Sequence, residues 1–218
     1  MRPFVLITAV VLILVGPVIA WVVLHNDLVD REERVLKDWA QVQSNFQRRA
    51  DLIPRLVESL SRYLQHERET LSAVTAQRGA ALSPLETALR ELDTARQEAG
   101  AVMEHHAAQA PATDAELAAI NAAQARVHSD LTRVIALAEN YPNLHASDQF
   151  LALQAQLEGT ENRINVARMR FNEAVQDYNR ALRTLPSSLV AREEGLERKA
   201  YFQADSGTAQ ARELGFDD

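Results

Sequence analysis

The chain has 218 residues, a formal net charge of −7 and no cysteine, so disulfides and thiolate metal sites are excluded. Lys and Arg alternate with Asp and Glu and form no basic stripe, which argues against a nucleic-acid-binding protein. Only 7 Gly and 7 Pro punctuate a chain dominated by Ala, Leu, Gln, Glu and Arg, a composition typical of long helices.

The chain begins with an apolar segment, Phe4–Leu24, that contains no charged residue. At about 1.5 Å per residue it reaches roughly 31 Å as a helix, the thickness of the hydrocarbon core of a bilayer. A cleaved signal peptide is the alternative, with cleavage after Ala20. Because Trp21–Leu24 continues the apolar run past that point, we favour a membrane anchor over residues 1–26.

Positive charges near the anchor indicate its orientation only weakly. Arg2 and the α-amino group flank one end, whereas Arg31, Arg34 and Lys37 lie farther from the other end. Because the nearer charges are N-terminal, the positive-inside rule favours an N-terminus in the cytoplasm. We expect a single-pass protein of the bacterial inner membrane whose soluble domain faces the periplasm.

The next predicted helix runs from near Leu28 to Gly79 and carries apolar residues in steps of four and three. This heptad-like seam predicts a helix bundle or coiled coil, with Arg49 and Glu67 occupying two seam positions. The expected buried residues are Val35, Trp39, Val42, Phe46, Ile53, Leu56, Leu60, Tyr63, Leu71 and Val74.

Pro54 lies in the middle of this helix. A proline removes one backbone hydrogen bond and clashes with the preceding turn, so we expect a kink over residues 50–54. The kink either fits the helix around its core or marks a hinge or the entrance to a groove.

Two capping boxes predict the next two helices. Ser83–Glu86 starts a helix from Pro84 to about Gln109, and Thr113–Glu116 starts a helix from Asp114 to about Asn140. Their expected inward residues are Leu85, Leu89, Leu92, Ala95 and Ala99, then Leu117, Ile120, Val127, Leu131, Val134 and Leu137. A turn is expected at residues 140–143.

A fourth helix starts at Ser147–Asp148 and reaches Leu185, just before Pro186. Its expected apolar stripe comprises Phe150, Leu153, Leu157, Ile164, Phe171, Val175, Tyr178, Leu182 and Leu185. A short segment over Leu189–Lys199 and a loose tail follow.

Together these elements predict an all-α protein, with an N-terminal transmembrane helix followed by an elongated antiparallel four-helix bundle. The expected divisions are the anchor at 1–26, the bundle at 27–186, and a short helix with the tail at 187–218.

Three blocks of residues resemble the LemA family. Residues 48–57, RRADLIPRLV, resemble its RR-x-DLIPxLV signature. Residues 141–144 with 150–154 resemble its second block, and residues 158–164, 167–168, 171–172 and 178–179 its third, although Phe171 stands where the family often has Tyr. The resemblance covers residues 30–205. It implies a bacterial membrane-anchored helical bundle without catalytic residues; a magnetosome-membrane relative suggests membrane organisation or assembly.

A polar stripe runs beside the apolar stripe of the fourth helix: Glu161, Asn165, Arg168, Asn172 and Asn179. If it faces a groove between the first and fourth helices, Glu161 can pair with Arg48 or Arg49. Such a pair adds little net stability but can fix helix register. The stripe therefore either holds the helices together, which we favour, or lines a groove in which a partner docks. Loss of folding in Arg168→Ala would favour the role in holding the helices together. Loss of partner binding in a folded protein would favour the docking role.

No pattern of catalytic or metal-ligating residues stands out. His105 and His106 point about 100° apart on a helix, and no HExxH, GxSxG or glycine-rich phosphate loop occurs. We therefore expect no enzyme activity, no metal and no cofactor.

The sequence favours a membrane-anchored scaffold or adaptor that binds another membrane or envelope protein. A membrane-organising homo-oligomer, or an accessory subunit of a membrane protease or transporter, is the alternative. The expected partners are the lipid bilayer and a protein of unknown identity, with no nucleic acid.

Overall fold

The computed structural model describes residues 2–71, 76–105, 110–141, 144 and 147–203, and for residues 2–12, 70–71 and 76–81 only the backbone. Five helices make up most of this described part, which contains no strand, so the all-α prediction is confirmed. They are α1 (Arg2–Leu71), α2 (Ala76–His105), α3 (Asp114–Ala138), α5 (Asp148–Ala181) and α6 (Ser187–Glu193).

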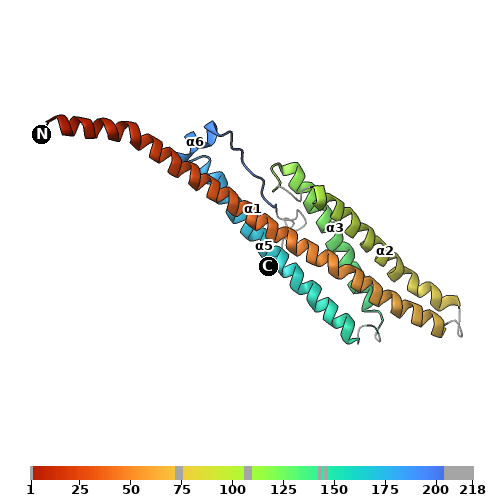
Figure 1. The fold of residues 1–218 in the computed structure, drawn as a ribbon. Coiled ribbons are helices and arrows are strands. Elements are labelled where there is room, and N and C mark those ends of the chain that lie inside the picture. The colour runs from red at the N-terminus through yellow and green to blue at the C-terminus, as the bar shows by residue number, and fades with distance from the viewer. Residues whose placement is uncertain (1, 72–75, 106–109, 142–143, 145–146, 204–218) are drawn as a thin grey trace, which may run out of the picture.

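The helices pack as an elongated antiparallel bundle built on α1 (Figure 1). Helix α1 is continuous from the apolar segment into the bundle, and its 70 residues reach roughly 105 Å at about 1.5 Å each. Helix α5 lies along α1, α2 pairs with α3, and α1 also contacts α2 and α6. The apolar segment and the bundle therefore share one helix.

The core consists of two main clusters along the rod. The distal cluster joins Leu52–Leu64 of α1 to the apolar faces of α2, α3 and the first half of α5. The proximal cluster joins Val35–Phe46 of α1 to α3, to the second half of α5, and to Ala200 and Phe202. Most predicted inward positions are buried, whereas Tyr63, Leu137 and Leu182 are only partly buried.

The predicted boundary between the first two helices is wrong. Helix α1 ends at Leu71, and Gly79 and Pro84 both lie inside α2. Leu82 and Leu85 are buried on either side of Pro84, so apolar packing keeps this stretch helical despite the start signal of Ser83. Val74 and residues 142–143 of the predicted turn lie outside the described residues.

The predicted end of the fourth helix is also wrong. Helix α5 ends at Ala181, and Leu185 is 76% exposed rather than buried. A residue that precedes proline is disfavoured in the helical conformation, and Pro186 follows Leu185 directly. The predicted segment at Leu189–Lys199 is replaced by α6 and a non-helical stretch that returns along α5 (Figure 1). The tail from residue 204 lies outside the described residues.

Helix α1 remains helical through Pro54, whose side chain is exposed. Figure 1 shows α1 as a gently curved rod rather than two rods joined at a sharp bend. The missing N–H of Pro54 leaves the carbonyl of Ala50 without its helical partner, at a cost in helix stability.

We predict that Pro54→Ala raises the free energy of unfolding by about 1–3 kcal/mol, because alanine restores this hydrogen bond and has the higher helix propensity. Thermal unfolding of the full chain in detergent, followed by circular dichroism, measures the change. Arg55→Ala, at the exposed neighbouring position, is the control and should shift stability by less than about 0.5 kcal/mol. A destabilised Pro54→Ala would show that the proline fits a bend the fold requires.

Candidate functional site

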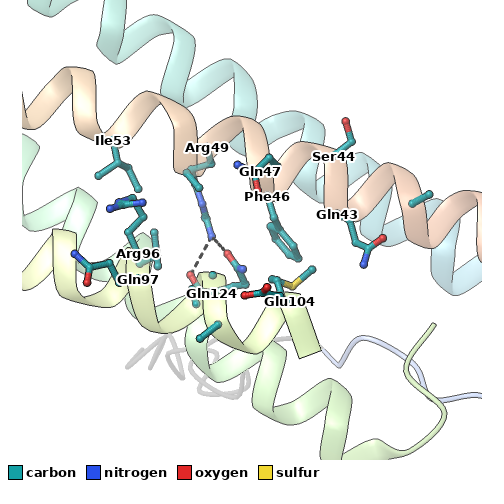
Figure 2. Close-up of a pocket in the computed structure, with 17 residues that line it drawn as sticks. Gln43, Ser44, Phe46, Gln47, Arg49, Ile53, Arg96, Gln97, Glu104 and Gln124 are labelled. Carbon is teal, nitrogen blue, oxygen red and sulfur yellow. Dashed lines mark hydrogen bonds between the residues drawn. The ribbon is translucent and has the colours of Figure 1, made fainter. Parts of the chain in front are cut away.

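Arg49 occupies the centre of the bundle, where α1, α3 and α5 meet. Its side chain is only 2% exposed. Its Nη1 donates a hydrogen bond to Oε2 of Glu161 at 2.9 Å. Its Nη2 donates to the backbone carbonyl of Gln124 at 3.2 Å and to the side-chain oxygen of Gln124 (Figure 2). One guanidinium thus links three helices.

Burial lowers the pKa of Arg49, and the adjacent Glu161 carboxylate partly offsets this effect. The Arg49 guanidinium also lies 5.6 Å from the ring centroid of Phe46. Glu161 is 28% exposed, and Nδ1 of His128 lies 3.5 Å from its other oxygen. Of the two arginines proposed as partners of Glu161, the structure selects Arg49, since Arg48 is exposed.

Arg168 connects α5 to α3 and to the returning segment. Its Nη2 lies 3.1 Å from Oδ1 of Asn121 and 3.4 Å from the backbone carbonyl of Gln203. Its guanidinium packs over the ring of Phe202, 4.8 Å from the centroid. Phe202 in turn packs against Phe171 and Trp39, so the cation covers an aromatic cluster. These contacts within the chain favour the interpretation that the stripe holds the bundle together.

Asn172 and Asn179 hold the returning segment by reciprocal hydrogen bonds. The amide of Asn179 donates to the carbonyl of Lys199 at 2.8 Å and accepts from its N–H at 2.9 Å. Asn172 bonds Phe202 in the same way, at 2.9 and 2.8 Å. Asn172 and Asn179 are seven helical residues apart, about 10.5 Å. Lys199 and Phe202 are three extended residues apart, about 10 Å, so the two spacings match. We call residues 199–203 the strap.

Lys199 ties the strap to α1. Its Nζ lies 2.8 Å from Oε1 of Glu32 and 5.3 Å from the ring centroid of Tyr178. Burial raises the pKa of Tyr178 to about 12. Helical periodicity in the sequence did not predict the strap as the partner of the polar stripe. The sequence feature that could have indicated the strap was the pair Asn172 and Asn179, seven residues apart on one helix face.

The two remaining predicted site residues stand apart from these contacts. Asn165 and Pro54 are both exposed, and neither takes part in the contacts described above. The predicted stripe therefore divides into a part that bonds within the chain, with Glu161, Arg168, Asn172 and Asn179, and an exposed position at Asn165.

A groove of about 870 Å³ opens between α1 and α2 beside Arg49 (Figure 2). Helix α3 contributes Gln124 and Val127 to its lining. Its walls carry polar side chains, with small residues between them: Gln43, Ser44, Gln47, Arg96, Gln97 and Glu104, then Ala40, Ala50, Ala99, Gly100 and Ala101. Across the described ranges, no group of three or more His, Asp and Glu side chains is placed to hold a metal ion.

We predict that Arg49→Met destabilises the bundle by about 1–3 kcal/mol, because Glu161 and the Gln124 carbonyl lose their buried donor. Chemical unfolding measures the loss, and adding Glu161→Gln should recover part of it. Arg48→Met is the matched control at an exposed position. Equal effects of the two arginine substitutions would contradict the role given to Arg49.

Asn179→Ala should release the strap, since it leaves the N–H and carbonyl of Lys199 without partners, at a cost of about 1–3 kcal/mol. Hydrogen exchange of the backbone amides of Lys199 and Phe202 should accelerate, while exchange in the distal core stays unchanged. Asn165→Ala, on the same helix but exposed, is the control. Unchanged exchange at Lys199 would show that the amide pairing does not hold the strap.

Comparison with known proteins places the chain in a family. A search of curated proteins finds none that matches it. The LemA family model matches residues 38–216, which includes Arg49, the whole polar stripe and the strap. Because this match covers most of the chain, the protein belongs to the LemA family.

Proposed function

We propose that the protein is a non-enzymatic, membrane-anchored scaffold or adaptor that presents its bundle to another membrane or envelope protein. The continuity of α1 carries this proposal. An anchor and a bundle that share one helix hold the binding surface at a set distance from the bilayer, with no intervening flexible linker.

The exposed apolar side chains at the start of α1 support the membrane part of the proposal. Helix α1 is long and apolar enough to span a membrane. Ile13, Leu14 and Val18 are 71%, 67% and 61% exposed. Exposed apolar side chains of this kind need a cover, and a bilayer matches the length of the apolar run Phe4–Leu24 in the sequence. We propose the bacterial inner membrane, with the bundle in the periplasm.

The groove between α1 and α2 is the proposed contact surface. Its amide and charged side chains offer hydrogen bonds, and its alanines and Gly100 allow close approach of a partner helix. A Cβ atom added at Gly100 would meet no neighbouring atom within 4 Å, so this position has room for a side chain.

A cysteine placed at Gly100 tests the proposal, because the chain has no cysteine of its own. We predict that the full-length Gly100→Cys protein, crosslinked in intact cells, forms one specific adduct, and that Gly100→Trp abolishes co-purification of the same partner in mild detergent. Mass spectrometry of the adduct identifies the partner as a second copy, a protease, a transporter or another envelope protein.

Ala136→Cys and Ala136→Trp are the matched controls, at an exposed position of α3. They should give no specific adduct and normal co-purification. Identical adducts at both positions would overturn the groove as the contact surface. Recovery of no specific partner from either position would overturn the scaffold proposal.

A further inference from the structure

The α5–α6 end of the bundle packs against the end of the apolar segment. Leu28 forms a small core with Ala181, Val190 and Ala191, and Leu24 packs at its edge. Nδ1 of His25 lies 3.5 Å from Oε1 of Glu194. Figure 1 shows α6 beside α1 where the N-terminal arm leaves the bundle.

These contacts fix the depth of α6 relative to a bilayer that surrounds the apolar segment. Trp21 stacks on His25 with ring centroids 5.2 Å apart, and tryptophan is enriched at the membrane interface. From Leu24 to Leu28 the helix rises about 6 Å. The headgroup layer on each side is about 5–8 Å thick. Helix α6 therefore lies at the level of the lipid headgroups.

The same end of the bundle exposes two large apolar side chains. Leu185 is 76% exposed and Leu189 is 61% exposed, although neighbouring Val190 and Ala191 are buried. The turn that carries Leu185 is the point where the chain reverses at the membrane-proximal end of α5. In water these leucines have no cover, whereas the boundary between headgroups and acyl chains would bury them.

A basic hollow of about 410 Å³ reaches Thr184, the residue that precedes Leu185. Arg180, Arg183 and Arg198 line it together with Gln176, Asn179, Thr184 and Tyr201. None of the three arginines forms an ion pair with an acid in the described part of the chain. Glu193, Glu194 and Glu197 also lie at this end, and Glu194 faces His25. Arginines that converge without acidic partners suit a phosphate.

We propose that the α5–α6 end is a second membrane contact. Leu185 and Leu189 enter the headgroup–acyl boundary, and Arg180, Arg183 and Arg198 bind the phosphate of an anionic phospholipid. This contact rests on the membrane anchoring proposed above but is independent of the scaffold role. It would hold the rod at a set tilt, because the continuous α1 fixes the bundle to its span but leaves the tilt of that span in the bilayer free.

Single cysteines in the otherwise cysteine-free full chain test the contact. The variants Leu189→Cys and Leu185→Cys carry an environment-sensitive fluorophore, and the protein is reconstituted in phosphatidylcholine vesicles with or without phosphatidylglycerol. Lipids with a quencher near the headgroup should quench both labels several-fold more than a label at Leu151→Cys, an exposed position at the distal end of α5. Phosphatidylglycerol should increase this quenching.

Charge variants test whether the hollow binds the phosphate of an anionic lipid. The triple variant Arg180→Gln, Arg183→Gln, Arg198→Gln should lose the phosphatidylglycerol effect, whereas Arg170→Gln, an exposed arginine of α5, should keep it. Inorganic phosphate that abolishes the effect at the concentration of the lipid would reassign the hollow to a free anion and overturn the lipid assignment.

A label at Val15→Cys, inside the apolar segment, distinguishes failure of the contact from failure of the anchor. If a quencher deep in the acyl chains fails to quench it, the anchoring itself is wrong. If it is quenched while the labels at 185 and 189 match the label at 151, the anchor stands and the second contact is overturned.

Discussion

The continuity of α1 is the constraint on which the rest of the structure depends. Both main core clusters use one face of this helix, and the cluster under α6 uses its Leu28. The hairpin of α2 and α3 and the long helix α5 are therefore positioned by a common axis. Because the apolar segment belongs to the same helix, the orientation of this segment and that of the bundle are mechanically coupled.

Buried polar contacts set how the other helices lie on that axis. Apolar stripes tolerate sliding by a heptad, because one leucine can replace another in a given gap. Arg49 does not allow such sliding, since its buried charge needs Glu161 and the Gln124 carbonyl together. A register shift would strand the guanidinium without partners, at a cost larger than the pair contributes to stability. The contacts of Arg49 with Glu161 and Gln124 thus chiefly fix one helix register among the several that the apolar stripes alone would allow.

The periodicity of the apolar residues predicted much of the fold. The charged Arg49, which interrupts this periodicity in α1, indicated part of the site. The seam of α1 and the apolar faces of α2 and α3 follow from spacing alone, and the sequence offered Arg48 or Arg49 as the partner of Glu161. The ends of α1 at Leu71 and of α5 at Ala181 do not follow from spacing. Packing of Leu82 and Leu85 keeps Pro84 inside α2 despite the capping signal of Ser83. The strap was missed because its hydrogen bonds join a helix to an extended segment, and helical periodicity carries no information about such a partner.

The strap covers the C-terminal half of the polar stripe and limits what that half can bind. Arg168, Asn172 and Asn179 use their donors on the backbone of residues 199–203, and Phe202 completes the aromatic cluster with Trp39 and Phe171. A partner that docked on this stripe would first have to displace a segment held by four reciprocal hydrogen bonds and a buried aromatic ring. Recognition on the α1–α2 groove carries no such cost, which is why we place the proposed protein contact there rather than on the stripe.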